Sequence, residues 1–301
     1  MAELASIVAG RLARLADSAA LAEMPARIEA GSPAQAVELD EWAARAGVAA
    51  SELLALDGGL VATLAAAGIE RSLGLYVDGP NGPVLAGAWS LPEREAEQVA
   101  LRPCAGGWLF GLPGMIGLAG VSAAGVAIVA NHLRPATLGP GLPGGVLLRS
   151  LLDAPDIGRA RSRIEATPLA DGRNWMLADG ETFFGIEQLG DQRILTRVGP
   201  KTGHVHANHC FDPALRQREA TPRDPLSFRR LELASTVYVQ RRPATGAAVL
   251  EFFDEVEAAA FAEPGERAQT LLAIEITAGL AHWRAGAGQR IHTTRLSPEL
   301  P

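Results

Sequence analysis

The sequence predicts an α+β fold in which two β-sheets are covered by helices. Three observations lead to this prediction. Apolar residues recur at helical spacing up to about residue 69, strand patterns begin at about residue 70, and helical and strand segments beyond that point are partly segregated along the chain. A segregated order of helices and strands is typical of α+β proteins.

The first part of the chain is predicted to be helical. Apolar residues repeat at a spacing near 3.6 in 3–21, 36–48 and 50–68, and Ser51 is the expected cap of the third helix. Two strand patterns, 73–77 and 84–89, then flank the segment DGPNGP, whose Asn81-Gly82 pair is typical of a hairpin turn. We therefore expect a helical leader that gives way to sheet at about Glu70.

The remaining elements follow the same two periodicities. Strands are predicted at 107–110, 125–131, 174–178, 182–188, 193–197 and 204–210. Helices are predicted at about 145–153, 156–166, 225–241 and 247–262, and residues 270–277 with 279–284 form an expected closing hairpin. The Pro- and Gly-rich run 135–145 is interpreted as a loop inside the fold.

Composition narrows the class of protein. The 301 residues are 48% hydrophobic, enough for a large core, and the net charge is −7 with basic residues spread along the chain. We expect no nucleic-acid partner and no membrane partner. The N-terminus lacks the continuous apolar core of a signal peptide, so the expected location is cytoplasmic. Cys104 and Cys210 give no disulfide framework, and Lys201, the single lysine, is interpreted as a solvated turn residue.

Half of the six histidines lie in one decapeptide, GHVHANHCFD, at 203–212. On a strand, the period of two places His204, His206, Asn208 and Cys210 on one face and His209 on the other. Four polar side chains on one face rarely serve packing alone. This segment is therefore the first candidate for a functional site.

A glycine-rich block and three further segments carry a resemblance. The block GLPGMIGLAGVSAAGVAIVAN at 111–131 resembles the signature of the acyl-coenzyme A:6-aminopenicillanic acid acyltransferase (isopenicillin-N acyltransferase) family. The segments GGVLLRSLL at 144–152, NWMLADGETFFGIE at 174–187 and HANH at 206–209 agree with the family in order and similar spacing. The resemblance covers roughly residues 35 to 285.

The resemblance implies an N-terminal-nucleophile hydrolase fold, a four-layer αββα sandwich. Family members are precursors that cut themselves before a cysteine and use its α-amine as the base. Serine stands at that position here, in Arg71-Ser72-Leu73-Gly74. The implied domains are a leader, 1–71, and a core, 72–301, that form one compact unit, and Ser72 is the implied nucleophile.

At the other site positions that the resemblance implies, this sequence keeps some residues of the family pattern and changes others. Asn208 matches the family asparagine that donates to the oxyanion, a role that needs a fixed neutral donor. Ser90 stands where the family has an aspartate, and Arg267 is the candidate for a family arginine, although Ala262 is an alternative alignment. His206 joins the candidate catalytic set as a nearby titratable group.

Several residues are candidates for substrate binding. Trp89 and Trp175 are aromatic candidates for a pocket, although large aromatic side chains more often fill the core. Met115, His204 and His209 complete the set. Asp179, Glu181 and Glu187 are expected to be strand-edge charges, so the paired carboxylates of glycosidases are absent.

A metal site is the weaker interpretation of the histidines. His204, His206, Cys210 and Asp212 have ligand atoms that zinc accepts. The family pattern already contains this histidine-asparagine segment without a metal, and His132, His282 and His292 are isolated in the sequence. We expect no metal and no cofactor.

Two functions from different classes remain open. One is an amide hydrolase or acyltransferase that acts on a small-molecule amide or acyl thioester through an acyl-serine at Ser72. The other is an uncleaved homologue that uses the same pocket for ligand binding or for non-acyl chemistry in small-molecule biosynthesis, with His206 or His209 as general base. A small-molecule substrate is expected in either case, and a homo-oligomer is compatible with the sequence.

Overall fold

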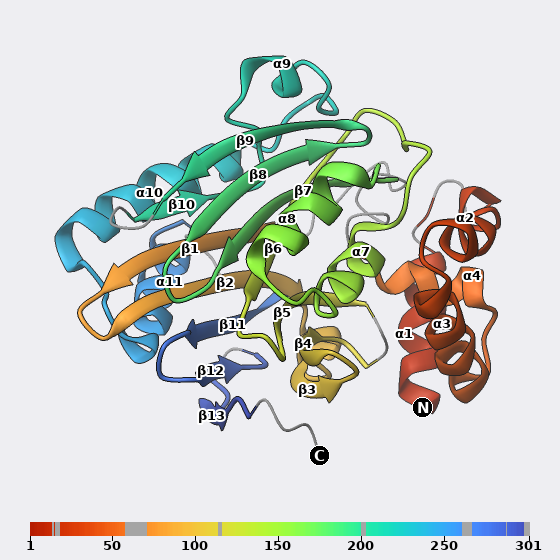
Figure 1. The fold of residues 1–301 in the computed structure, drawn as a ribbon, viewed down its shortest axis with the longest axis horizontal. Coiled ribbons are helices and arrows are strands. Elements are labelled where there is room, and N and C mark those ends of the chain that lie inside the picture. The colour runs from red at the N-terminus through yellow and green to blue at the C-terminus, as the bar shows by residue number, and fades with distance from the viewer. Residues whose placement is uncertain are drawn as a thin grey trace.

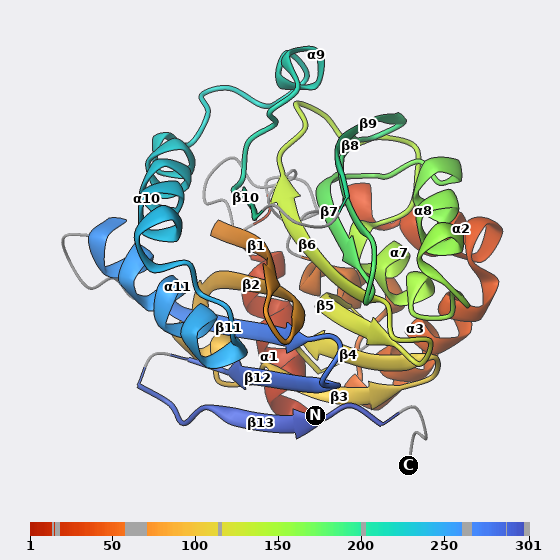
Figure 2. The ribbon, with the colours of Figure 1, turned by 60° about the vertical axis from the view of Figure 1, so that its left-hand side comes forward.

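Two antiparallel sheets face each other between layers of helices. The computed structural model describes residues 1–13, 15, 19–57, 71–113, 116–199, 203–260, 267–286 and 288–297. One sheet has six strands in the order β10-β1-β2-β11-β12-β13, and the other has seven in the order β3 to β9 (Figure 1). Helices α10 and α11 cover the first sheet, and α7 and α8 cover the second (Figure 2). The predicted four-layer α+β sandwich is confirmed.

The elements have the following bounds. The helices are α1 Ala2–Leu12, α2 Met24–Gly31, α3 Pro33–Ala46, α4 Ala50–Leu53, α6 Glu93–Ala96, α7 Gly144–Leu151, α8 Ile157–Ala166, α9 Pro213–Arg216, α10 Pro225–Arg241 and α11 Gly246–Ala260, with 3₁₀ turns η1 Ala19–Leu21 and η2 Leu54–Leu56. The strands are β1 Arg71–Gly79, β2 Gly82–Pro92, β3 Ala100–Cys104, β4 Gly107–Gly111, β5 Gly117–Ser122, β6 Ala127–Leu133, β7 Gly172–Ala178, β8 Phe183–Leu189, β9 Gln192–Val198, β10 His204–His206, β11 Arg267–Glu275, β12 Leu280–Arg284 and β13 His292–Arg295.

The predicted hairpin is confirmed and longer than expected. Strands β1 and β2 pair from Arg71 with Ser90 to Gly79 with Gly82, around the Asn81-Gly82 turn. Gly82 has φ of 104°, a backbone conformation that favours glycine. Three short strands were not predicted: β5 is rich in glycine and small residues, β3 contains a proline, and β13 contains no apolar residue.

Three sequence expectations are wrong. The segment 204–210 is a strand only as far as His206, because β10 ends there. Ser51 lies inside α4, whose N-cap is Ala49, and the backbone N–H of Ala49 donates to the Glu52 carboxylate. Glu187 is no edge charge: it is fully buried in β8. Of the predicted helix 50–68, residues 58–68 lie outside the described residues.

Alternate side chains of β1 pack in two different apolar cores. Leu73, Leu75 and Val77 pack against α10 and α11, while Tyr76 faces the seven-stranded sheet. Ser72 and Gly74 share the parity of Tyr76 and therefore lie between the sheets. At Gly74 the sheets approach so closely that an added Cβ would lie 2.5 Å from the Met176 sulfur.

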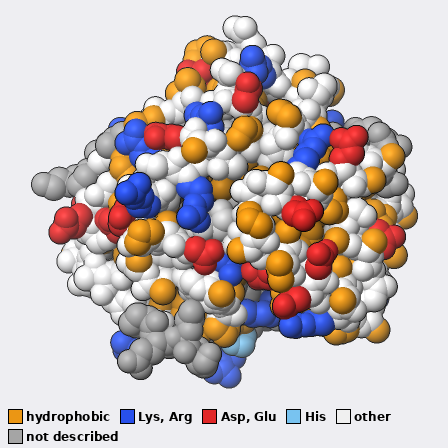
Figure 3. Space-filling view, turned by 45° about the vertical axis from the view of Figure 1, so that its right-hand side comes forward, with side chains coloured by type: hydrophobic (Ala, Val, Ile, Leu, Met, Phe, Trp, Pro, Cys, Tyr) orange, Lys and Arg blue, Asp and Glu red, His pale blue; other side chains and the backbone are white. Residues whose placement is uncertain are grey.

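The helices before β1 belong to the same core as the sheets. Leu4, Val8, Met24 and Ile28 fall into one apolar cluster with the inward side chains of both sheets. A buried ion pair joins Arg11 to Glu95 at 2.6 Å. Within the described residues, no helix has the length and apolarity needed to cross a membrane. On the face drawn in Figure 3, basic and acidic side chains alternate without a large patch of one sign.

Candidate active site around Ser72

Ser72 lies at the start of β1 and is fully buried. Its neighbours across the sheet are Trp89 of β2 and, one strand further, Thr270 of β11. Across the gap between the sheets lies the end of β6, where the backbone N–H of His132 donates to Ser72 Oγ at 3.2 Å. The serine is thus enclosed by both sheets.

Asn208 holds Ser72 through its side-chain amide. Asn208 Oδ1 accepts from the backbone N–H of Ser72 at 2.7 Å, and Nδ2 donates to Ser72 Oγ at 2.7 Å and to the carbonyl of His132 at 2.9 Å. A backbone N–H can only donate and a carbonyl can only accept, so these partners fix the orientation of the amide. Asn208 therefore meets both the nitrogen and the oxygen of the candidate nucleophile.

Two donors converge on Ser72 Oγ. They are Nδ2 of Asn208 and the backbone N–H of His132. Donors aimed at an oxygen stabilise negative charge that develops on it or beside it. The arrangement is suited to a reaction in which this oxygen attacks a carbonyl carbon.

Charged groups lie on the other side of Ser72, toward α10. Arg230 Nη1 donates to the Ser72 carbonyl at 3.3 Å, and its Nη2 lies 3.4 Å from Glu257. Burial, with the nearby charge of Arg71, lowers the pKa of Arg230 despite the carboxylates of Glu257 and Asp224. Arg71 itself lies 3.6 Å from Asp224, the N-cap residue of α10. The backbone on both sides of the candidate cleavage position is thereby fixed.

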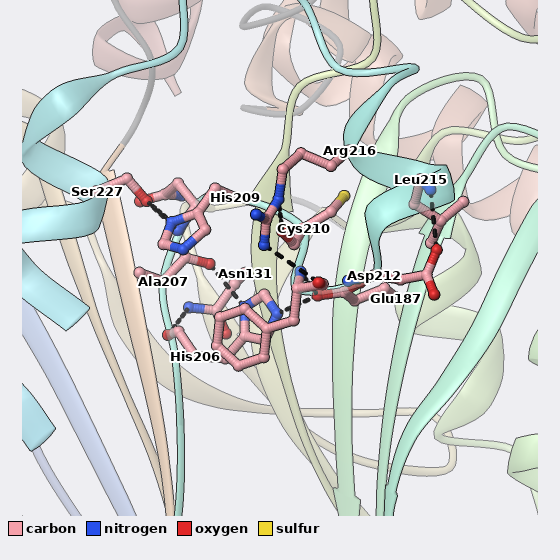
Figure 4. Close-up of polar contacts among 12 residues, drawn as sticks. Asn131, Glu187, His206, Ala207, His209, Cys210, Asp212, Leu215, Arg216 and Ser227 are labelled. Carbon is pink, nitrogen blue, oxygen red and sulfur yellow. Dashed lines mark hydrogen bonds and ion pairs between the residues drawn. The ribbon is translucent and has the colours of Figure 1, made fainter. Parts of the chain in front are cut away.

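Glu187 is a buried carboxylate that holds the loop carrying Asn208 (Figure 4). Glu187 Oε1 lies 2.7 Å from His206 Nε2 and accepts from Phe211 N at 2.5 Å, and Oε2 accepts from Asp212 N at 3.0 Å. Burial alone would raise the pKa of Glu187, but the hydrogen bonds from His206 and the two amides hold it below its ordinary value. Glu187 therefore positions the loop as a carboxylate.

Both ring nitrogens of His206 lie within hydrogen-bond distance of an oxygen. Nδ1 lies 2.8 Å from the carbonyl oxygen of Ala207, which can only accept, so Nδ1 carries a proton. Nε2 faces the Glu187 carboxylate, which already accepts from two backbone amides. Both ring nitrogens of His206 are therefore engaged by neighbouring oxygens, and neither points at Ser72. Its catalytic role stays a prediction.

The other two histidines of the segment stay neutral. His209 contacts Ser227 Oγ through Nδ1 at 2.8 Å, and the same hydroxyl accepts from the backbone N–H of Asn208. Burial, then the charges of His206 and Arg216, lower the pKa of His209 to about 4. Burial, with the charges of His206 and Arg197, lowers the pKa of His204 to about 3.

The remaining predicted residues are spread over several places. Trp89 is buried between the sheets beside Ser72 and donates to the Ala130 carbonyl at 3.2 Å. Trp175 packs under α7 and α8, on the far face of its sheet. Ser90 is next to Trp89 in β2, so alternation points it away from the inter-sheet space that holds Ser72. Arg267 opens β11, where its backbone pairs with Pro92. Met115 lies outside the described residues.

Sequence reasoning did not find four groups that contact the site: Arg230, Ser227, Glu187 and the backbone N–H of His132. Arg230 lies 158 residues from Ser72 in sequence, and a backbone amide leaves no trace in residue types. The Asp-Pro start of a helix at 224–225 was the one signal that α10 begins close to a site. Its first turn carries Ser227 to Asn208.

The metal interpretation finds no support in the described part of the chain. No group of three or more His, Cys, Asp or Glu side chains there could hold a metal ion. Cys210 packs in an apolar cluster with Leu133, Leu189 and Leu215, and Asp212 caps α9. Both are structural in this fold.

Comparison with known families now identifies the chain. A model described as acyl-coenzyme A:6-aminopenicillanic acid acyl-transferase matches residues 99–274, more than half of the sequence. The protein belongs to the acyl-coenzyme A:6-aminopenicillanic acid acyltransferase family, as its glycine block and HANH segment predict.

Solved structures with similar folds are distant in sequence. Penicillin V acylase from Agrobacterium tumefaciens is 14% identical, with a TM-score of 0.48 over 74% of this chain and 86% of that one. The C2A mutant of conjugated bile acid hydrolase from Clostridium perfringens is 11% identical, with a TM-score of 0.47 over 74% and 92%. The Caenorhabditis elegans N-acylethanolamine-hydrolyzing acid amidase ortholog is 11% identical, with a TM-score of 0.47 over 68% and 92%. No curated protein matches the chain.

Proposed function

We propose that the protein is an amide hydrolase or acyltransferase that acts on a small-molecule amide or acyl thioester through an acyl-serine intermediate at Ser72. The observation that carries the proposal is the pair of contacts from the Asn208 side chain to the backbone nitrogen and Oγ of Ser72, both at 2.7 Å. A nucleophile that uses its own α-amine as base needs both atoms held together.

The first step is cleavage of the chain before Ser72. Ser72 Oγ attacks the carbonyl carbon of Arg71, the Arg71–Ser72 carbon–nitrogen bond breaks, and the proton of the hydroxyl passes to the departing nitrogen. The product is an ester between the Arg71 carbonyl and Ser72 Oγ. Water hydrolyses this ester and leaves the Arg71 carboxylate and a free Ser72 α-amine.

Cleavage would convert the site from latent to active. The Ser72 nitrogen is an amide in the uncut chain and has no basic lone pair. As an α-amine its ordinary pKa is near 8, so it is partly unprotonated at neutral pH. Asn208 Oδ1, which accepts from this nitrogen now, would then orient the amine toward Oγ.

In turnover, the amine takes the proton of Ser72 Oγ as the oxygen attacks the substrate carbonyl. Nδ2 of Asn208 and the backbone N–H of His132 supply donors next to the oxygen on which charge develops. The acyl group is transferred to Ser72 Oγ, and the amine or thiol of the substrate leaves with the proton that the α-amine had taken. Water or a second amine molecule then takes the acyl group from Ser72. Small-molecule substrates agree with a nucleophile that is fully buried.

The test is the intact mass of freshly purified protein with N-terminal sequencing of any fragment. Wild type is expected to give two fragments, the larger beginning at Ser72. Ser72→Ala is expected to stay whole, and Ser72→Cys, which restores the family nucleophile, is expected to be cut. Ser150→Ala, at a buried serine of α7 that bonds to the Leu147 carbonyl, is the matched control and should be cut like wild type.

A chain that stays whole in wild type and in Ser72→Cys would reject this function. The protein would then be an uncleaved homologue that uses the pocket beside Asn208 for ligand binding or for non-acyl chemistry. Cleavage at Ser72 without acyl transfer from any amide or thioester substrate would support the nucleophile and reject the substrate class.

A further inference from the structure

A recess in the protein surface lies beside Asn208. Its polar lining includes Arg134, Asn208, His209, Glu219, Arg223 and Asp224. The enclosed part has room for about one water molecule, and the rest opens to solvent. A ligand can therefore reach these side chains from outside without entering the core of the protein.

Two backbone segments are tied together at this recess. Arg134 follows the end of β6, and its carbonyl accepts from the backbone N–H of Ala220 at 2.8 Å. The backbone N–H of Ala136 in turn donates to the carbonyl of Arg218 at 2.9 Å. The strand end that carries Arg134 is thus fixed against the loop that follows Asn208.

The two carboxylates of the recess already have cationic partners. Glu219 Oε2 accepts from Arg223 Nε at 3.1 Å, and Asp224 Oδ2 lies 3.6 Å from Arg71 Nε. Burial raises the pKa of Glu219, and a proton on that carboxyl would only make the recess more positive. His209 is neutral at pH 7, because burial and then the neighbouring charges lower its pKa to about 4. These groups leave no negative charge over.

Arg134 is a further arginine of the recess and has no such partner. Its Nε is buried, and its side chain forms no hydrogen bond or ion pair with any described residue. A guanidinium is always charged, and its planar fork matches the two oxygens of a carboxylate. A buried donor without an acceptor is rare in folded proteins and calls for a ligand. The charge and geometry at Arg134 favour a carboxylate.

Arg134 is also close to the candidate nucleophile. The backbone N–H of His132, two residues before Arg134, donates to Ser72 Oγ at 3.2 Å. At the usual rise along a strand, the Cα atoms of His132 and Arg134 lie roughly 7 Å apart. A carboxylate at Arg134 and an acyl carbon beside Ser72 Oγ can therefore belong to one small molecule.

We propose that Arg134 binds a carboxylate of the substrate in this recess, so that the substrate is an amide or acyl thioester that also bears a carboxylate. This inference rests on the proposed function and names the class of its substrate. Arg134 acts in recognition and takes no part in the transfer of protons or of the acyl group.

The experiment measures binding to full-length Ser72→Ala by NMR, so that neither cleavage nor turnover is needed. Two probes are titrated at pH 7 and constant ionic strength: N-acetylglycine, with its carboxylate on the amine side of the amide, and succinamate, with its carboxylate on the acyl side. We expect saturable changes in the ring resonances of His209, which lines the recess, and none at His292. N-acetylglycinamide and succinamide, the neutral counterparts, should bind about tenfold more weakly or worse.

Variants in the same background test Arg134 itself. Arg134→Gln should lower the affinity for the carboxylates to that for the neutral probes, and Ala220→Leu, which enlarges a side chain of the recess wall, should weaken binding with every charge kept. Arg218→Gln is the matched control, because the Arg218 side chain is 57% exposed and pairs with Asp191 at 3.7 Å, so binding should persist. Unchanged ring resonances of His282 and His292 report that each variant is folded.

The stronger of the two carboxylate probes shows on which side of the scissile bond the carboxylate lies. Three results would overturn the proposal: no saturable change at His209, equal affinity for charged and neutral probes, or carboxylate binding that survives Arg134→Gln or Ala220→Leu. Failure of the proposed function is recognised separately, by a wild-type chain that stays whole. Carboxylate binding in such a chain would keep the site and assign it to an uncleaved homologue.

Discussion

One side-chain amide fixes the candidate nucleophile at both of its reactive atoms. Asn208 is 6% exposed, and its side-chain oxygen and nitrogen bond to Ser72 and to the His132 carbonyl. Oδ1 orients the nitrogen and Nδ2 supplies a donor to Oγ. These two tasks can be separated experimentally because aspartate keeps the oxygen and lacks the N–H₂ group.

We predict that Asn208→Asp leaves the fold intact but slows cleavage before Ser72 by roughly 10²- to 10³-fold, the usual effect of losing one oxyanion donor. The measurement is the rate at which the fragment beginning at Ser72 accumulates. Asn81→Asp makes the same chemical change in the exposed β1–β2 turn and serves as control. Equal rates for Asn208→Asp and wild type would exclude this role.

The contribution of the buried pair of Glu187 and His206 to the unfolding free energy is predicted to depend on pH. Removing one partner of such a pair usually costs about 3–5 kcal/mol, and we expect Glu187→Gln to lower the unfolding free energy by that order at pH 7. The folded pKa of Glu187 is lowered, so its contribution is present above about pH 4.5 and is lost as the pH falls through the folded value. Urea unfolding at pH 7 and at about pH 3 should therefore show the gap between wild type and variant closing in acid.

The matched control for that prediction is Glu181→Gln, a change at an exposed turn residue. Its unfolding free energy should follow wild type to within about 0.5 kcal/mol at both pH values. If the difference in unfolding free energy between wild type and Glu187→Gln did not change with pH, the shape of the side chain and not its charge would hold the loop.

At this scale the sequence predicts the residue types better than their contacts. Ser72 and Asn208 were named from the family pattern, and their side chains are in contact although the residues are 136 positions apart in sequence. Glu187 was misjudged because a carboxylate in an alternating strand gives no sign of a buried histidine partner on another sheet. Arg230 could not be found, since its target is a backbone carbonyl.

Among the elements, the helix α7 depends on residues that precede the sheets. Asp57 follows η2 and is fully buried, and its carboxylate accepts from Gly145 N at 2.6 Å and contacts Arg173 at 2.5 Å. A carboxylate at a helix N-terminus satisfies a backbone N–H that has no partner within the helix. A residue that precedes β1 therefore completes the start of α7.

Asp171 shares the same arginine and is predicted to make stability fall as pH rises. Its Oδ2 lies 2.8 Å from Arg173, but burial first and the nearby Asp57 raise the pKa of Asp171 to about 8, despite the attraction of Arg173. Between its ordinary value of 3.8 and about 8, the folded protein holds a proton that the unfolded chain has released. Unfolding free energy must decline with rising pH across that window.

Asp171→Asn removes this titration, so its urea unfolding free energy should fall less between pH 5 and pH 8 than that of wild type. The expected difference is on the order of 1 kcal/mol or more, because one pKa unit corresponds to about 1.4 kcal/mol. Asp191→Asn, at an exposed residue, should follow wild type. If the unfolding free energy of Asp171→Asn fell more steeply between pH 5 and pH 8 than that of wild type, the raised pKa of Asp171 would be rejected as the cause of the decline.

Over the whole molecule, the close approach of the sheets at Gly74 sets the geometry of the site. We predict that Gly74→Ala lowers the unfolding free energy by about 1–3 kcal/mol, because its methyl would lie 2.5 Å from Met176 Sδ and 2.6 Å from Asn131 Oδ1. Thermal and urea unfolding measure the effect. Gly180→Ala, with open space around it, is the control, and an equal loss there would mean that sheet packing is not the cause.

The global fold was within reach of the sequence, while its detailed packing was not. The order of the predicted helices and strands and the hairpin follow from periodicity and turn residues, and they are confirmed, although β3, β5 and β13 were not predicted. The end of β10 at His206 was missed because the alternation of polar residues continues through 204–210 although the hydrogen bonds of the strand do not. Loop residues there bond to Glu187 and Ser227, which periodicity cannot reveal.

The long separation of Ser72 and Asn208 also bears on how the protein is made. The ribosome delivers the serine first, and 136 further residues must follow before the amide that holds it exists. Arg230, which bonds to the Ser72 carbonyl, is synthesised later still. Self-cleavage would thus wait until the ribosome has passed Arg230 and the two sheets have met, so that an appearing fragment reports a correctly assembled site.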